Sequence, residues 1–171
     1  MVDFFSHALW AFALFHREPS AVAYILFSLV PDMLFAAPAI LLFLGSGFSL
    51  KKLSRFRKLP HESASKLPFF SLVRTVYRMS HSWLVMAAIA VLVGIVYRPL
   101  VFPFVGGVLL HLSLDLFTHK RSMADHAGQM PLYPLSEWKV EGIIHWSDRR
   151  FLAVNYGLLC LAYILIWAGV F

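Results

Sequence analysis

Apolar residues in this chain gather in five runs that are separated by shorter polar stretches. A helix needs about 20 mostly apolar residues to cross the roughly 30 Å apolar core of a bilayer. Most of the runs reach or approach this length, which predicts an all-α protein built as a transmembrane bundle of about five helices. The expected helices cover residues 4–15, 21–44, 83–97, 100–117 and 151–171, and the third continues a helix that begins near Phe69.

Proline and polar residues mark where these helices end. The second run is interrupted by Pro31-Asp32, and a proline inside a helix removes a hydrogen bond and perturbs the backbone. Pro19 ends the first helix, and Arg98-Pro99 forms a tight turn between the third and fourth. The sequence therefore predicts a second helix that is broken at Pro31-Asp32.

The composition agrees with a membrane protein of one domain. Of the 171 residues, 60% are hydrophobic, whereas an ordinary soluble domain is about 45–50% apolar. The length fits one integral membrane domain over residues 1–171. Cys160 is the single cysteine, which excludes a disulfide framework and a thiolate metal site.

The net charge of +6 is concentrated in one polar stretch. Residues 50–78 carry eight Lys and Arg against one acidic residue, and residues 120–150 carry five basic and four acidic residues. By the positive-inside rule, both are expected to be cytoplasmic loops of an inner-membrane protein, with a cytoplasmic N-terminus and an external C-terminus. The basic stretch lacks a nucleic-acid-binding motif or an aromatic platform, so the lipid bilayer is the expected partner and nucleic acid is not.

Six ionisable residues lie within or at the ends of the apolar runs. On insertion scales each such group costs about 2.5–3.5 kcal/mol, and they usually face the bundle interior and pair or bind a ligand. They are the candidate metal ligands: His7, Asp32, His81, His111, Asp115 and His119.

The last three of these have helical spacing. His111, Asp115 and His119 are at i, i+4 and i+8, so they lie along one face of a helix and can share one or two metal ions. Two alternatives stay open: Asp115 orients a histidine rather than binding metal, and His119 interacts with the helix C-terminus.

The other candidates are expected at the same membrane face. The topology rests on the distribution of Lys and Arg alone. It places His7 and His81 near the cytoplasmic ends of their helices. Asp32, at the helix break, is expected to act as a ligand or a proton carrier. The remaining histidines are expected in loops or at the interface, and they are His16, His61, His126 and His145.

Five short motifs occur in one order along most of the chain: SHALWAF, LVPDML, MSHSWL, LLHLSLDLFTH and PLYPLS. In this ordered set the chain resembles the LexA-regulated, inner-membrane-associated metal-dependent hydrolases of bacteria and archaea. The resemblance implies a small polytopic membrane protein whose divalent-metal site is formed by His7, Asp32, His81, His111 and Asp115. A looser similarity to zinc-dependent phospholipase C implies a phosphoester substrate, including one within a lipid.

The loop after the fourth helix is expected to cover the cytoplasmic face. Its candidates for lining the mouth of the site are Tyr133, Ser136, Trp146 and Asp148. The alternative is that Tyr133, Trp138 and Trp146 anchor the chain at the interface. Arg149 and Arg150 either attract an anionic headgroup or hold the helix end in the cytoplasm.

These observations favour a membrane-embedded metal-dependent hydrolase that acts on a phosphoester or lipid. The expected cofactor is a divalent ion, zinc or alternatively manganese. Either Asp32 or Asp115 is the expected catalytic base. Two other functions fit the same residues: a transporter or channel for metal ions or protons, and a non-catalytic membrane scaffold.

Overall fold

The computed structural model describes residues 3–45, 70–120 and 129–170, and the regular secondary structure in these ranges is helical, without any extended strand. The all-α expectation is confirmed for this part of the chain. The α-helices are α1 (Phe4–Phe15), α2 (Ala21–Ser28), α3 (Val30–Gly45), α6 (Phe70–Ser80), α7 (Trp83–Val96), α8 (Val101–Thr118) and α9 (Arg149–Trp167), with a 3-10 turn at Arg98–Leu100 before α8.

The second apolar run is broken, but not at the expected residues. α2 ends at Ser28 and α3 begins at Val30, so the break is at Leu29 and the two helices are bent by 45°. Pro31 instead lies in the first turn of α3. A proline is tolerated there because the first backbone N–H groups of a helix have no intrahelical partner.

The expected continuous helix from Phe69 to residue 97 is also wrong, because it is two helices. α6 and α7 are bent by 62° at His81-Ser82, where Ser82 caps α7 by accepting a hydrogen bond from the Val85 amide. Residues 70–78, which the sequence pattern placed both in this helix and at the end of the basic loop, belong to α6. Its arginines and apolar residues alternate with helical periodicity, so it forms an amphipathic helix. The rest of that basic stretch, up to residue 69, lies outside the described residues.

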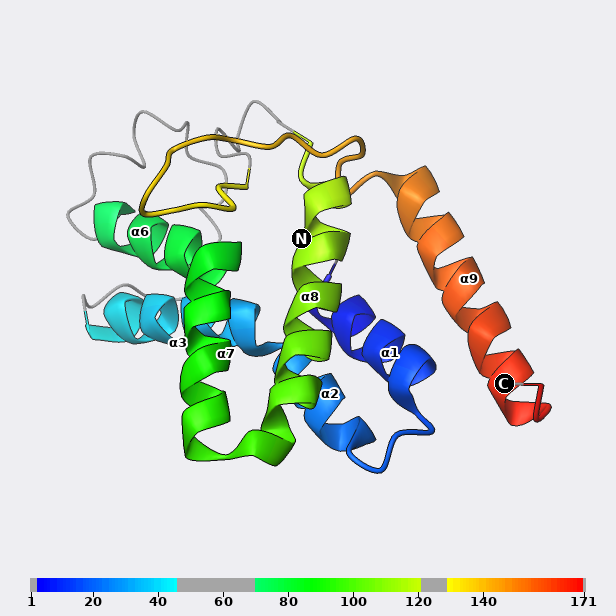
Figure 1. The fold of residues 1–171 in the computed structure, drawn as a ribbon. Helices are drawn as coiled ribbons and strands as arrows, with labels where there is room; N and C mark the ends of the chain where they lie inside the picture. The colour runs from blue at the N-terminus through cyan, green and yellow to red at the C-terminus, as the bar shows by residue number, and fades with distance from the viewer. Residues whose placement is uncertain (1–2, 46–69, 121–128, 171) are drawn as a thin grey trace.

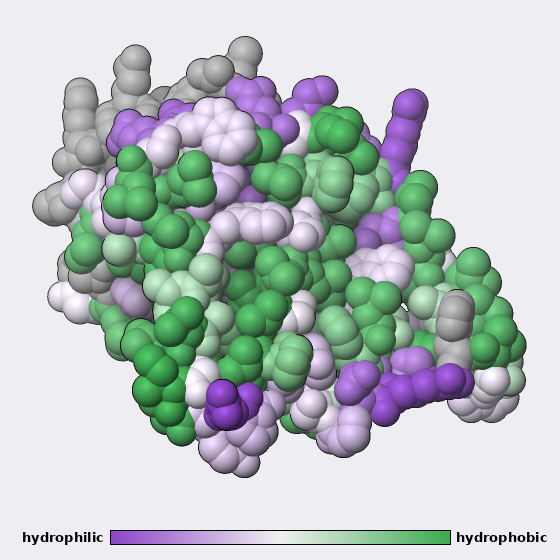
Figure 2. Space-filling view, in the orientation of Figure 1, coloured by the Kyte–Doolittle hydropathy of each residue, from purple (hydrophilic) through white to green (hydrophobic). Residues whose placement is uncertain are grey.

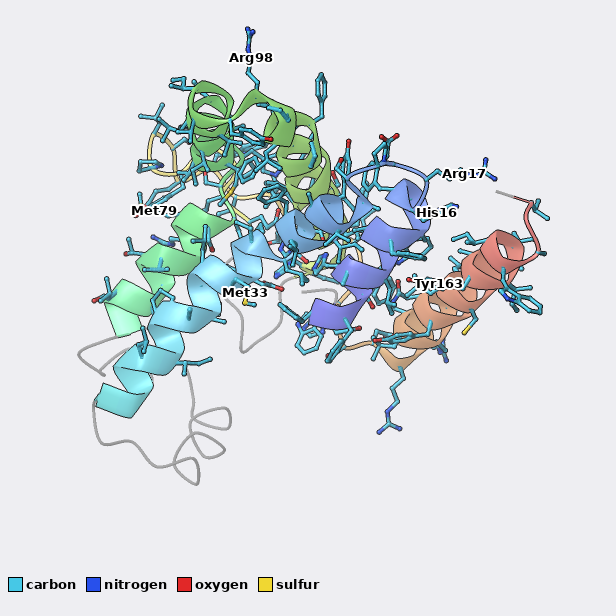
Figure 3. The ribbon with its side chains drawn as sticks, turned by 90° about the horizontal axis from the view of Figure 1, so that it is seen from below. His16, Arg17, Met33, Met79, Arg98 and Tyr163 are labelled. Atoms are coloured by element: carbon cyan, nitrogen blue, oxygen red, sulfur yellow. The ribbon has the colours of Figure 1, made fainter. Side chains whose placement is uncertain are left out.

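Helix α8 is the centre of the fold. It contacts α1, α2, α3 and α7, while α9 packs on α1. α3 and α6 lie side by side and extend away from the vertical pair α7 and α8 (Figure 1 and Figure 3). The segment 129–148 crosses the C-terminal end of α8, at the top of Figure 1.

Two glycines allow α8 to approach α2 closely. A Cβ atom on Gly107 would lie 2.6 Å from the Tyr24 carbonyl oxygen and 2.8 Å from the Ser28 nitrogen, and one on Gly106 would lie 2.6 Å from the Tyr24 ring. Small residues at helix contacts are typical of membrane bundles, where the backbones pack directly. The close contact brings His111, one turn after Gly107, to the end of α2.

Helix α9 is held to α1 by polar contacts. The Trp10 indole N–H donates to Asn155 Oδ1 at 2.9 Å, and Asn155 Nδ2 donates to Ser6 Oγ at 2.9 Å. The Tyr156 hydroxyl donates to Asp3 Oδ1 at 2.8 Å. Burial raises the pKa of Asp3, but the hydrogen bonds from Tyr156 and Ser6 outweigh it and lower the pKa overall. These bonds fix α9 beside the turn of α1 that carries His7.

The helices define a membrane protein with two to four candidate spans, rather than a clear set of five. Residues Arg98–Thr118 and Arg149–Trp167 are long and apolar enough to cross a bilayer, and each bent pair, α2 with α3 and α6 with α7, qualifies as a span if counted as one. α1 is apolar but shorter. In Figure 2, hydrophobic residues cover the middle of the molecule, and hydrophilic residues gather along its upper and lower margins.

Candidate metal centre

Five of the six candidate ligands converge inside the bundle. They come from four separate parts of the chain, and each is at most 1% exposed. The five are His7 of α1, Asp32 of α3, His81 at the α6–α7 bend, and His111 and Asp115 of α8. Long-range packing therefore brings together the residues that the sequence pattern selected.

Three of these residues form a compact triangle of ligand atoms. The Nε2 atoms of His81 and His111 are 3.5 Å apart, and Asp115 Oδ2 is 3.6 Å from the first and 3.5 Å from the second. Asp32 Oδ1 lies 3.5 Å from His81 Nε2 and 3.9 Å from His111 Nε2. Tetrahedral ligands about 2.0–2.1 Å from a zinc ion are separated by about 3.3–3.4 Å. The spacing of each carboxylate from the two histidines therefore suits a divalent ion.

His7 approaches the same carboxylate from its other side. His7 Nε2 is 3.3 Å from Asp115 Oδ1, and its ring stacks on His111 with the centroids 3.8 Å apart. The ligand atoms fall into two overlapping triads within 4.8 Å, His7 with His111 and Asp115, and Asp32 with His81 and His111. The arrangement accommodates one ion or two adjacent ions.

Backbone carbonyls orient two of the histidines. His111 Nδ1 is 2.7 Å from the Ser28 carbonyl oxygen, and His81 Nδ1 is 3.1 Å from the Tyr77 carbonyl oxygen. A carbonyl only accepts, so Nδ1 of His111 carries the hydrogen and its Nε2 presents a lone pair to the centre. This is the usual arrangement of metal-binding histidines. His81 Nδ1 has a second partner, the Ser80 hydroxyl at 2.9 Å.

The two helix bends place the groups that the centre requires. The end of α2 supplies the Ser28 carbonyl, and the first turn of α3 supplies Asp32, where the helix dipole favours a carboxylate. The α6–α7 bend supplies His81. Broken helices within a membrane are tolerated where they line a polar site, and both breaks meet that condition.

Two of the ligands have buried polar atoms without hydrogen bonds. His7 Nδ1 and Asp32 Oδ2 are buried without a hydrogen-bond partner among the described residues. The other polar atom of each side chain faces a member of the cluster: His7 Nε2 is 3.3 Å from Asp115 Oδ1, and Asp32 Oδ1 is 3.5 Å from His81 Nε2. Burying such groups is costly unless they are paired or bind a cation. This observation supports a cation site independently of the ligand spacing.

His119, the sixth candidate ligand, lies beside the centre in another role. Its Nδ1 is 2.9 Å from the Asp115 carbonyl oxygen, and its Nε2 is 2.9 Å from the Tyr77 hydroxyl. It belongs to neither triad, although its Nδ1 is 3.9 Å from Asp115 Oδ2. Both ring nitrogens are thus engaged, and His119 connects α8 to Tyr77.

Two residues next to the cluster, Tyr77 and Ser28, were not predicted from the sequence. The Tyr77 ring stacks on His81 at 4.2 Å and its carbonyl orients that histidine. The i, i+4 spacing of Tyr77 and His81 was a usable signal. No sequence signal pointed to Ser28, because it acts through its backbone carbonyl.

The segment 129–148 covers this end of the bundle. The amides of Gly142 and Trp146 donate to the carbonyls of His119 and Thr118, so the segment satisfies the last turn of α8. Ser82 Oγ donates to the carbonyls of Pro131 and Tyr133, at 3.0 Å and 2.6 Å, which ties the segment to the α6–α7 bend.

The remaining described candidates are exposed or half-buried. Asp148 is exposed and caps α9, and hydrogen bonds from the Phe151 and Arg150 amides lower its pKa. Trp138 is 60% exposed, and Tyr133, Ser136 and Trp146 are half-buried in the covering segment. His16 and His145 bond locally, His16 to the Ala13 carbonyl and His145 to Ser147. His61 and His126 lie outside the described residues.

The described residues form an all-helical fold with two to four candidate membrane spans and a buried His and Asp cluster. Comparison with protein-family models, curated proteins and solved structures gives no match.

Proposed function

We propose that this protein is a membrane-embedded metal-dependent hydrolase whose substrate is a phosphoester. The observation that carries the proposal is the cluster of three histidines and two carboxylates, all buried, with ligand atoms 3.3–3.9 Å apart. The resemblance to inner-membrane metal-dependent hydrolases supports it, because the five residues that it implies are those of the cluster.

In the proposed reaction, His81, His111, Asp115 and Asp32 would hold a divalent ion, zinc or alternatively manganese. Such an ion would supply a water whose pKa is lowered to about 7. Either Asp32 or Asp115 would take a proton from this water as its oxygen adds to phosphorus, and would return that proton to the ester oxygen as the bond from phosphorus to that oxygen breaks. His7, 3.3 Å from Asp115 Oδ1, holds that carboxylate in position.

Chelation is expected to abolish hydrolysis, because the ion supplies the nucleophile. Purified protein in detergent should hydrolyse bis(p-nitrophenyl) phosphate, lose this activity on dialysis against a chelator, and regain it with zinc or manganese. The released p-nitrophenol measures each step. An enzyme that stays active when metal analysis finds no bound ion would contradict the proposal.

We also propose that the chain crosses the bilayer five times, with α1 and both bent pairs as spans and the N-terminus in the cytoplasm. The α1–α2 and α7–α8 connections lie at the same edge of the molecule, opposite the segment 129–148 (Figure 1). Arg17 and Arg98 project from these connections (Figure 3). If these two short connections are outside the cell, the basic stretch at residues 50–78 is in the cytoplasm, as the positive-inside rule predicts.

Cysteine labelling tests this topology. In a Cys160→Ser background, Arg17→Cys is expected to react with a membrane-impermeant maleimide added to intact cells. Lys139→Cys is expected to react only after the membrane is permeabilised. The reverse pattern, or equal labelling of both positions in intact cells, would refute the arrangement.

A further inference from the structure

An apolar groove runs between α7 and α8, from the level of the metal centre toward the opposite side of the bundle. Its volume is about 370 Å³, within the range of about 300–1,000 Å³ typical of small-molecule sites. Met86, Phe104 and Leu112 form its floor, each at most 3% exposed. All of its lining residues are apolar or aromatic, so its chemistry suits a hydrocarbon chain.

The groove forms because α7 carries small side chains where it faces α8. Ala87 and Ala90, at i and i+3 on α7, line it and leave space that larger side chains would fill. α7 and α8 face the viewer in Figure 1, and this part of the surface in Figure 2 is predominantly hydrophobic. Since α8 is a candidate span, the groove lies in the apolar part of the molecule.

The upper end of the groove is next to the candidate metal centre. Trp83 lines it and follows His81 by two residues, and Leu112 lines it and directly follows His111. Leu112 is about 1.5 Å from His111 along the α8 axis, and Trp83 is the first residue of α7, directly after the bend that carries His81. From Leu112 the groove follows α8 back to Phe104, a length of about 12 Å.

Trp83 adds a polar atom at this end. Its indole N–H is buried and has no hydrogen-bond partner among the described residues. A lipid has an oxygen-rich ester and phosphate region directly above its acyl chain, and such oxygens accept from an indole N–H. The order along the groove is therefore hydrocarbon site, N–H donor and then metal centre, which is the order of a phospholipid from tail to headgroup.

We propose that this groove binds one acyl chain of a membrane phospholipid and thereby presents the phosphoester of that lipid to the metal centre. The inference rests on the proposed hydrolase function and identifies its substrate class as a lipid. An acyl chain in the bilayer would enter the groove from the side. There it would exchange its contacts with other lipid chains for contacts with the apolar residues of the groove.

Photo-crosslinking tests the groove without any turnover. The protein is reconstituted in phosphatidylcholine vesicles that contain phosphatidylcholine with a diazirine in the middle of one acyl chain, and cross-linked peptides are identified by mass spectrometry. We expect about tenfold more labelling at the groove than at Leu158 and Leu161 on α9, the ratio given by a preference of about 1.4 kcal/mol. These leucines are 50% and 51% exposed and serve as a reference for ordinary lipid contact.

Two alanine-to-phenylalanine substitutions on α7 form a matched pair. Ala87→Phe should fill the groove and lower labelling there by about tenfold, whereas Ala88→Phe, at an exposed position outside the lining, should leave it unchanged. Labelling of the wild-type groove no stronger than that of α9 would overturn the inference, as would an unchanged yield in a folded Ala87→Phe variant. If the Ala87→Phe variant does not fold, the ratio of groove labelling to α9 labelling in the wild type alone tests the inference.

The labelling and the hydrolysis assay fail independently. Absence of metal-dependent hydrolysis would refute the hydrolase proposal and leave selective labelling intact. Uniform labelling in a protein that hydrolyses bis(p-nitrophenyl) phosphate would refute the lipid groove alone.

Discussion

Asp115→Asn is expected to remove the bound metal while the protein remains folded. The two side chains have nearly the same shape, but the amide is neutral and replaces an oxygen that lies 3.5 Å and 3.6 Å from His111 and His81. Loss of an outer-shell partner alone typically lowers metal affinity about 10–100-fold, so loss of this shared carboxylate should exceed that. Mass spectrometry of detergent-purified protein measures the metal bound per chain.

Asp148→Asn is the matched control. This carboxylate is exposed, caps α9 and takes no part in the buried cluster, so metal content should equal that of the wild type. Stoichiometric metal in Asp115→Asn would show that the proposed ligand set is wrong. If the wild type also binds no metal after reconstitution with zinc or manganese, a proton pathway or a scaffold becomes the better explanation of the buried groups.

Gly107→Ala is expected to destabilise the protein and to disturb the centre. The new Cβ would lie 2.6 Å from the Tyr24 carbonyl oxygen and 2.8 Å from the Ser28 nitrogen, and these backbone atoms move only if α2 and α8 separate. Overpacking of this kind typically costs about 1–3 kcal/mol. Since His111 bonds to the Ser28 carbonyl, separation should also lower metal content. Thermal unfolding in detergent and metal analysis measure the two effects.

Gly157→Ala on α9 distinguishes this contact from a general effect of glycine. A Cβ there meets nothing within 4 Å. The substitution should be neutral or should raise stability by up to about 0.5–1 kcal/mol, the usual gain of alanine over glycine within a helix. A Gly107→Ala variant as stable as Gly157→Ala, with full metal content, would contradict the proposed role of the α2–α8 contact.

The sequence alone determined the helical class, the membrane setting and the choice of candidate residues. Helix α1 runs from Phe4 to Phe15, as the first apolar run predicts, and α8 and α9 differ from their predictions by only a few residues. These features depend on local hydrophobicity. Likewise, a histidine or carboxylate within an apolar run is conspicuous because burying it is costly. His7, Asp32, His81, His111 and Asp115 could therefore be selected before any contact was known.

Only the tertiary structure decided how these residues are arranged. The bends lie at Leu29 and at His81-Ser82, whereas the sequence pattern predicted a break at Pro31-Asp32 for the first and no bend for the second. The role of the Ser28 carbonyl follows from the approach of α2 to α8 at Gly107, which joins residues distant in sequence. His119 has the same helical spacing as the ligands, but Tyr77 engages its Nε2. Helical periodicity places a side chain on a face, whereas the partners of that face come from elsewhere in the chain.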